Sequence, residues 1–154
     1  MTIRRYTPAD CAAILQLFYD TVHTVNARDY SAAQLAVWAP ETADAVRWNA
    51  SLSAHTSVVA EEEGRLLGFG DLDGDYLDRL YVHKDAQRRG IATAIADALE
   101  AAAQEQQQTT VTVHASLTAK PFFEKRGYRV LRAQQVERSG IFLINFVMCK
   151  QLFR

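Results

Sequence analysis

The chain has 154 residues, 49% of them hydrophobic, and its formal net charge is −1 at pH 7. This size and apolar content suit one globular domain over residues 1–154 with a sizeable core. The near-neutral charge lacks the basic excess of nucleic-acid-binding proteins, and no stretch has the apolar length of a membrane span.

The N-terminal segment MTIRRYTPAD contains no apolar signal-peptide region. Cys11 and Cys149 stand far apart, at no metal-binding spacing, and both have apolar neighbours. We therefore expect two buried thiols in a cytoplasmic protein that binds no metal, no nucleic acid and no membrane.

The first third of the chain is expected to form one short strand, TIRRY, followed by helices. Thr7 and Pro8 form a helix-start signature, with Thr7 as the N-cap. The helix that follows carries a core-facing stripe at three-and-four spacing: Ile14, Leu17, Phe18, Thr21, Val22 and Val25. Ser31 can cap a second, short helix that ends before Pro40, and a further helical stretch runs to about Leu52.

The middle of the chain has the pattern of an antiparallel meander. The strand-like runs TSVVAEE and RLLGFGDLD are joined by a turn at Glu63-Gly64, and a second turn at Gly74-Asp75 leads into YLDRLYV. A helix is expected over 92–106, followed by the strand TTVTVHA, a short helix in TAKPFFEKRG, and a hairpin of YRVLRAQQVER and IFLINFVMC.

Residues 87–92, QRRGIA, form the corner between the strand YLDRLYV and the helix. A helix start leaves N–H groups without partners and carries the positive end of the helix dipole, so it can hold phosphate oxygens. Gly90 would let the backbone approach an anion, and Arg88 and Arg89 add positive charge. An ordinary solvated helix start is the alternative, and the pattern matches neither a Walker loop nor a dinucleotide fingerprint.

The corner QRRGIA resembles the Q/R-x-x-G-x-G/A signature of the GNAT acetyltransferase superfamily, which binds the pyrophosphate of acetyl-coenzyme A. SLTAKPFFEKRGY is similar to the second motif of that family, and YSAAQLAVWAP and NFVMCK resemble its YafP-like branch. The resemblance spans essentially the whole chain. It implies an α/β (α+β) fold with a central mixed, mostly antiparallel sheet of about seven strands flanked by helices.

In this family acetyl-coenzyme A lies where the strand before the corner splays from the next strand. The resemblance therefore implies that main-chain groups of the strand and corner hold the acetyl carbonyl, pantetheine and pyrophosphate: Leu80, Tyr81, Val82, Gln87, Arg88, Arg89, Gly90, Ile91, Ala92 and Thr93. The second motif would add contacts from Ser116, Ala119, Phe122 and Phe123.

Acetylation of an amine needs a neutral nitrogen, and a lysine-like amine with a pKa of about 10.4 is almost fully protonated at neutral pH. Asp78 lies where several relatives place a carboxylate base, although it also fits an exposed strand residue or a partner of Arg79. His83 and His114 are weaker candidates. No nucleophilic cysteine lies beside a histidine in the motifs, so we expect direct attack by the amine in a ternary complex.

Phe123 replaces the tyrosine that protonates the leaving thiolate in many relatives, and Ser116 replaces their asparagine. Tyr81 is the candidate acid, with Tyr128 a second possibility. A free thiol has a pKa of about 8.5, so a missing acid would slow the reaction without abolishing it. Phe123 also favours the alternative function, an acyl-coenzyme A-binding sensor or a catalytically degenerate domain.

The acceptor is expected to be a primary amine of a small molecule or a peptide. Tyr30, Trp38 and Trp48 lie in helices that form the acceptor wall in this family, although aromatic residues at helical spacing also fit a core. Asn145 interrupts the apolar run IFLINFVM and needs a partner or a wet pocket. Since this run is apolar on both strand faces, we expect it to be covered by a helix or by a second subunit in a homodimer.

Overall fold

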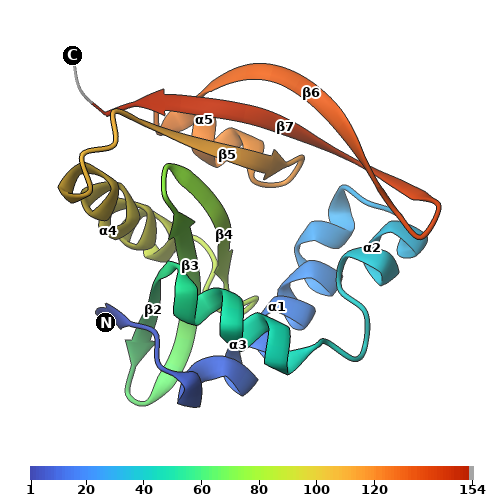
Figure 1. The fold of residues 1–154 in the computed structure, drawn as a ribbon. Coiled ribbons are helices and arrows are strands. Elements are labelled where there is room, and N and C mark those ends of the chain that lie inside the picture. Colours follow the sequence, from blue (N-terminus) through green and yellow to red (C-terminus); the bar gives the residue numbers. More distant parts are fainter. Residues whose placement is uncertain (153–154) are drawn as a thin grey trace.

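The computed structural model describes residues 1–152, which form a seven-stranded sheet with helices on both faces (Figure 1). The strand order is β1-β2-β3-β4-β5-β7-β6. Every neighbouring pair is antiparallel except β4 and β5, which are parallel. The predicted mixed, mostly antiparallel sheet is confirmed.

The elements follow the expected order, with boundaries that differ by a few residues. The strands are β1 (Thr2–Arg5), β2 (Thr56–Glu62), β3 (Arg65–Asp73), β4 (Tyr76–Val82), β5 (Thr110–Ser116), β6 (Arg129–Arg138) and β7 (Ile141–Gln151). The α-helices are α1 (Cys11–Thr24), α2 (Ala32–Trp38), α3 (Ala45–Ala54), α4 (Ile91–Glu105) and α5 (Lys120–Lys125).

Polar side chains fix where the first two helices begin. The Asp10 carboxylate accepts a hydrogen bond from the Thr7 N–H at 2.9 Å, and a 3₁₀ turn over Pro8–Asp10 separates this start from α1. At α2, Ser31 Oγ accepts from the Gln34 N–H at 3.2 Å, and Gln34 Oε1 accepts from the Ser31 N–H at 2.8 Å. This reciprocal capping box satisfies N–H groups that the helix leaves free.

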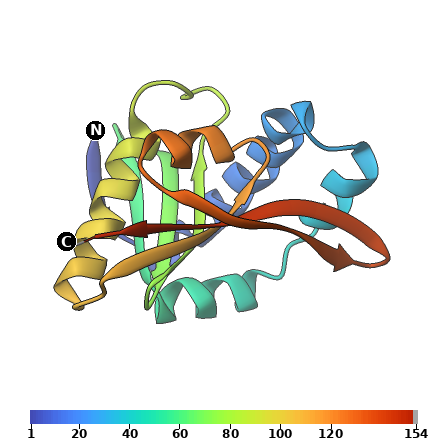
Figure 2. The ribbon, with the colours of Figure 1, turned by 90° about the horizontal axis from the view of Figure 1, so that it is seen from above.

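Helices α1 and α3 cover one face of the sheet and α4 covers the other (Figure 2). Helix α4 lies unusually close to β3, where a Cβ on Gly70 would stand 2.8 Å from Ile95 Cγ2 and 2.9 Å from the Arg79 carbonyl oxygen. Only glycine fits there. This close packing, which buries Ile95 and Leu99 completely, fixes the height of the α4 N-terminus above the sheet.

A buried carboxylate ties α4 to the C-terminal part of the chain. Glu100 Oε2 accepts hydrogen bonds from Arg126 Nε at 2.7 Å and from the Tyr128 hydroxyl at 2.8 Å, while Oε1 accepts from Lys150 Nζ at 2.8 Å. Burial raises the pKa of Glu100, but these three donors outweigh burial, and the pKa lies below its ordinary value.

Strands β6 and β7 form a long hairpin that reaches past the rest of the sheet to α2 (Figure 1), where Gln34 Nε2 donates to the Phe142 carbonyl at 2.9 Å. The expected burial of both faces of β7 does not extend to this end, since Phe142 is 53% exposed. β6 is exposed along most of its length because it is the last strand of the sheet.

Cys11 is buried and Cys149 is half-buried, so the expectation of two buried thiols holds only for Cys11. Within residues 1–152, no helix is long and apolar enough to cross a membrane.

Replacing Glu100 by Gln is expected to lower the free energy of unfolding by about 1–3 kcal/mol at neutral pH, because Arg126 and Lys150 lose their charged acceptor. The folded-state pKa is depressed, so this stabilisation is present above the unfolded pKa of about 4.3 and is lost as pH falls through the folded value. Urea unfolding at several pH values measures the difference. Glu105→Gln, exposed on the same helix, is the control, and equal stability of the Glu100 variant and wild type at neutral pH would contradict this role.

Candidate active site

A cleft of about 810 Å³ extends from the N-terminus of α4 along β4 and β5 to α1, α2 and β7. The two strands pair only at Tyr76–Thr112 and Leu77–Val113, so residues 78–82 of β4 have no partner on β5. Their main-chain groups on this side stay open to an amide-bearing ligand that pairs as an added strand would. Leu80, Tyr81 and Val82 lie in this stretch and line the cleft.

The corner before α4 has a backbone that requires glycine. Gly90 has a φ of 79° and caps the helix in the left-handed conformation. A Cβ there would meet no atom of residues 1–152 within 4 Å, so the space in front of the corner is open. The Ala94 N–H makes the first helical bond to the Gly90 carbonyl at 3.1 Å. The N–H groups of Ile91, Ala92 and Thr93, all in the cleft lining, precede this bond and have no helical partner.

Side chains hold the loop before this corner. The Val82 carbonyl accepts from Thr21 Oγ1 of α1 at 3.0 Å and from Gln87 Nε2 at 2.8 Å. The side chain of Gln87 therefore shapes the loop, and Gln87 and Arg88 both line the cleft. Arg89 does not line it; its exposed guanidinium lies 3.0 Å from Glu62 Oε2.

The second motif forms another wall of the same cleft, with Ser116, Ala119, Phe122 and Phe123 in the lining. Ser116 Oγ accepts from the Ala119 N–H at 3.0 Å and so shapes the turn into α5. Phe123 is only 2% exposed and packs edge-on against Phe122 and Tyr128. Its ring therefore belongs to the core as much as to the cleft.

Asp78 is the extra residue of a β-bulge. Asp71 of β3 pairs with Arg79, and Leu72 pairs with Leu77, so Asp78 has no partner on β3. The bulge turns the Asp78 and Arg79 side chains to the same face of the sheet, the face covered by α3. A regular strand would place these neighbours on opposite faces.

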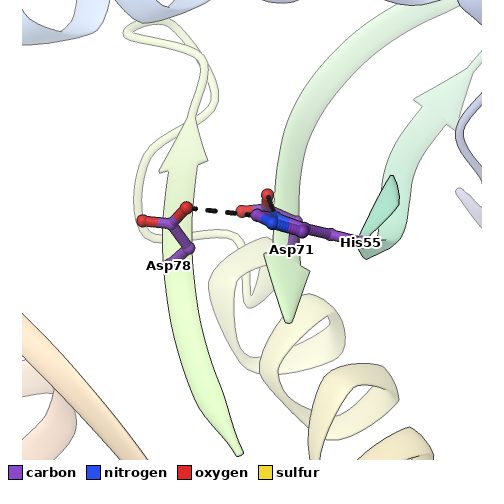
Figure 3. A group of neighbouring side chains, drawn as sticks. All are labelled: His55, Asp71 and Asp78. Atoms are coloured by element: carbon purple, nitrogen blue, oxygen red, sulfur yellow. Dashed lines mark hydrogen bonds and ion pairs between the residues drawn. The ribbon is translucent and has the colours of Figure 1, made fainter. Parts of the chain in front are cut away.

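On that face Asp78 adjoins a buried charge cluster (Figure 3). Asp71 is fully buried, with Oδ1 3.1 Å from Arg79 Nε and Oδ2 2.8 Å from His55 Nδ1. Arg79 also donates to Ser51 Oγ of α3 at 2.7 Å. Asp78 Oδ2 lies 3.8 Å from Arg79 Nη2 and 4.0 Å from His55 Nδ1.

The groups around Asp78 change the pKa of its carboxyl group. Burial raises the pKa of Asp78 and the negative charge of Asp71 raises it further, while Arg79 and His55 lower it less. The side chain is still 33% exposed. A carboxylate whose pKa is moved toward neutrality, and which can exchange protons with solvent, is a better general base than an ordinary aspartate.

The cluster does not fit a metal site. His55, Asp71 and Asp78 offer ligand atoms that lie within 4.8 Å of one another. The guanidinium of Arg79, however, bonds both oxygens of Asp71, so a fixed cation already neutralises the buried carboxylate of this group. The arrangement instead holds the Asp78 carboxylate beside a fixed positive charge.

A family model for the acetyltransferase (GNAT) domain matches residues 26–150. The chain belongs to the GNAT family. It is 34% identical over 146 residues to the uncharacterised N-acetyltransferase YafP of Escherichia coli (strain K12). The aligned region covers 95% of this chain and 93% of that protein. The predicted GNAT membership and acyltransferase class are confirmed.

Solved structures agree with this GNAT assignment. A GCN5-related N-acetyltransferase from Rhodopseudomonas palustris, also described as a class-II aminotransferase, shares 36% identity with a TM-score of 0.94, covering 97% of this chain and 94% of that one. The PaiA N-acetyltransferase of Thermoplasma acidophilum, solved with coenzyme A, has a TM-score of 0.79 at 16% identity, covering 97% and 98%. At this low identity, the similarity to PaiA shows a shared fold alone.

Of the two tyrosines considered as the acid of this GNAT enzyme, only Tyr81 lines the cleft. Its ring contacts Phe18 and Phe69 at centroid distances of 5.0 and 5.7 Å. Burial raises the pKa of Tyr81, so its hydroxyl keeps its proton at neutral pH. Tyr128 lies behind the cleft wall, where its hydroxyl donates to Glu100.

The residues expected at the acceptor end all line the cleft: Tyr30, Trp38, Trp48 and Asn145. Tyr30 lies in the loop before α2, not in a helix as expected. The Tyr30 hydroxyl donates to the Ile144 carbonyl at 2.8 Å and accepts from the Leu117 N–H at 2.9 Å. It therefore joins this end of the cleft to β7 and offers a ligand only its ring. Trp38 packs edge-on against that ring at 5.0 Å.

The sequence patterns did not single out His55 or Asp71, which adjoin Asp78. One signal was present: Asp71 interrupts the apolar strand RLLGFGDLD, and a buried aspartate needs a cation such as Arg79 on the next strand. His55 carried no comparable signal, because it reaches the cluster from the end of α3.

Asp78→Asn is expected to raise the melting temperature slightly at neutral pH. Because the folded pKa of Asp78 is raised, ionisation costs stability above that pKa, and the cost disappears below the unfolded value of about 3.9. Asparagine removes this cost, so the two proteins should converge in acid. Thermal melts between about pH 3 and pH 8 measure the difference. Asp75→Asn, in the exposed turn before β4, is the control, and a lower melting temperature of the Asp78 variant at neutral pH would contradict the expectation.

Proposed function

We propose that this GNAT protein transfers the acetyl group of acetyl-coenzyme A to the primary amine of a small molecule or a peptide. One observation carries the proposal: a single cleft joins the α4 N-terminus, the unpaired edge of β4 and the Asp78 carboxylate. PaiA was solved with coenzyme A, and yncA of Salmonella typhimurium, with the same fold, was solved with acetyl-coenzyme A. Both support a coenzyme of this kind.

Acetyl-coenzyme A, when bound, would supply an activated thioester. The free N–H groups of Gly90, Ile91, Ala92 and Thr93 would bind its pyrophosphate at the positive end of α4. Arg88 lines the same corner, and Arg89 would reach outlying phosphates after leaving its exposed, weak ion pair with Glu62.

The open edge of β4 would pair with the pantetheine amides through Leu80, Tyr81 and Val82. One N–H of this edge would donate to the thioester oxygen, where negative charge develops in the transition state. Ser116 and Phe122 would line the other side of the pantetheine, together with Ala119 and Phe123.

Asp78 would accept the proton of the acceptor amine, directly or through a water, so that the neutral amine attacks the thioester. Cys11 and Cys149 both lie outside the cleft lining, which supports direct transfer over a cysteine-bound acyl group. Tyr81 would return a proton to the departing thiolate, a role that Phe123 cannot fill because its ring has no acidic proton. Tyr30, Trp38 and Asn145 would contact the acceptor.

A homodimer through the C-terminal strands and a cytoplasmic location remain predictions. The exposed edge strand β6, with Leu131 56% exposed, and Phe142 on β7 offer an apolar surface of the kind that subunits cover.

Gly90→Ala is expected to weaken acetyl-coenzyme A binding about tenfold or more, because a non-glycine residue distorts the left-handed corner and fills the space before it. Gly140 has a nearly equal φ of 78° in the β6–β7 turn and, like Gly90, open space around it. Gly140→Ala is therefore a control with matched backbone strain. Both variants should melt earlier, but only Gly90→Ala should lose the ligand-induced rise in melting temperature. Equal protection of both variants would exclude this corner as the phosphate site.

Thiol release from acetyl-coenzyme A with a panel of primary amines tests the reaction. Wild type should release thiol with at least one amine. Asp78→Asn should lower kcat about 10²-fold or more, and its kcat should no longer show the fall at low pH that protonation of Asp78 causes in wild type. The Kd of acetyl-coenzyme A and the activity of Asp75→Asn should stay near wild type. Coenzyme binding without thiol release for any amine would instead favour the alternative, an acyl-coenzyme A-binding sensor.

A further inference from the structure

Asn145 carries a buried hydrogen-bond acceptor that the protein does not satisfy. Its Oδ1 is shielded from solvent and has no hydrogen-bond partner among residues 1–152, and the residue lines the cleft from β7. An unpaired buried oxygen destabilises the fold, so such an atom in a cleft points to a donor that arrives with a ligand.

The polar neighbours of Asn145 in the sheet do not bond its side-chain oxygen. In register, Asn145 lies beside Ser116 on β5 and Gln134 on β6. Ser116 Oγ accepts from the Ala119 N–H at 3.0 Å, and Gln134 Nε2 lies 3.4 Å from His114 Nδ1. Neither side chain forms a hydrogen bond with Asn145 Oδ1, which has no partner among residues 1–152.

The strand register places Asn145 on the same face of the sheet as the Asp78 cluster. Ala115 packs into the core on the α4 side, so its neighbour Ser116, and Asn145 beside it, face the other way. Leu143, two residues along β7, belongs to the core on the α1–α3 side. Of the residues proposed to line the coenzyme, Ile91 and Phe122 pack on the α4 side, whereas Ser116 lies beside Asn145 where the two halves of the cleft meet. Asn145 thus adjoins the acceptor half of the cleft.

We propose that Asn145 Oδ1 accepts a hydrogen bond from a second N–H group of the acceptor, and that the acceptor is an α-amino amide, the group at the N-terminus of a peptide. This inference rests on the proposed function. Asp78 supplies the negative charge that suits the reacting ammonium group. A neutral carboxamide oxygen suits a neutral amide N–H, whereas a second ammonium would favour another carboxylate.

A matched pair of acceptors tests this: an amino acid N-methylamide and the methyl ester of the same amino acid, which differ by an N–H in place of an oxygen. Wild type is expected to use the amide with a kcat/KM about tenfold or more above that of the ester. Asn145→Leu, of similar volume and without an acceptor atom, should remove this preference mainly through KM. It should lower kcat/KM for the ester less than for the amide, and leave the Kd of acetyl-coenzyme A within about twofold.

Stability gives an independent readout. Asn145→Leu should raise the melting temperature of the free enzyme, because it removes an unpaired buried oxygen. Asn145→Ala, which is smaller and also lacks an acceptor atom, should remove the preference for the amide as well, and this keeps the test informative if the leucine variant folds poorly.

Four results would overturn the inference: an unchanged amide preference in Asn145→Leu, an equal loss for amide and ester, weaker binding of acetyl-coenzyme A, or a lower melting temperature of a folded leucine variant. Failure of the proposed function looks different, because wild type would then acetylate neither compound nor any other amine.

Discussion

The pairing between β4 and β5 stops after two residues, and the site depends on this early end. Continued pairing would close the cleft and use the main-chain groups of residues 78–82 within the sheet. Two features keep the strands apart. The bulge at Asp78 changes the twist of β4, and the Val82 carbonyl is held by Thr21 and Gln87 as the chain leaves the sheet.

The position of α4 is the second requirement, because a helix N-terminus binds an anion only when its N–H groups face the open edge of β4. Gly68 and Gly70 let α4 approach the sheet, since a Cβ at either position would lie within 2.9 Å of α4 side chains. Glu100 then ties the helix to Arg126 and Lys150 from the far side. The corner at Gly90 is therefore placed by contacts that lie well away from it.

The charges around Asp78 show how the fold holds a group that is costly to bury. Burial and the neighbouring Asp71 disfavour the ionised form of Asp78, while Arg79 and His55 compensate in part. Asp71 itself is neutralised by Arg79, and Arg79 is held by Ser51 and by the face of the Trp48 ring, 4.7 Å away. Helix α3 thus holds the charges around Asp78 without lining the part of the cleft proposed for the coenzyme. Asn145 is a similar case, because its unpaired oxygen lowers stability at a place where a ligand can supply the donor.

Local sequence patterns were enough to predict the elements and to single out the corner proposed to bind phosphate. Alternating apolar residues, the turns at Gly64 and Gly74, and the capping serine at Ser31 act over a few residues, and the corner QRRGIA is continuous in the chain. Which polar side chains meet depends on the tertiary structure. His55, Asp71 and Asp78 come from the end of α3, from β3 and from β4, and a one-residue bulge, invisible in the pattern of YLDRLYV, brings Asp78 to the face of the other two. Likewise, the register of β7 against β5 and β6 leaves Asn145 Oδ1 without a donor. Such contacts depend on strand register and splay, which long-range packing sets and local sequence does not encode.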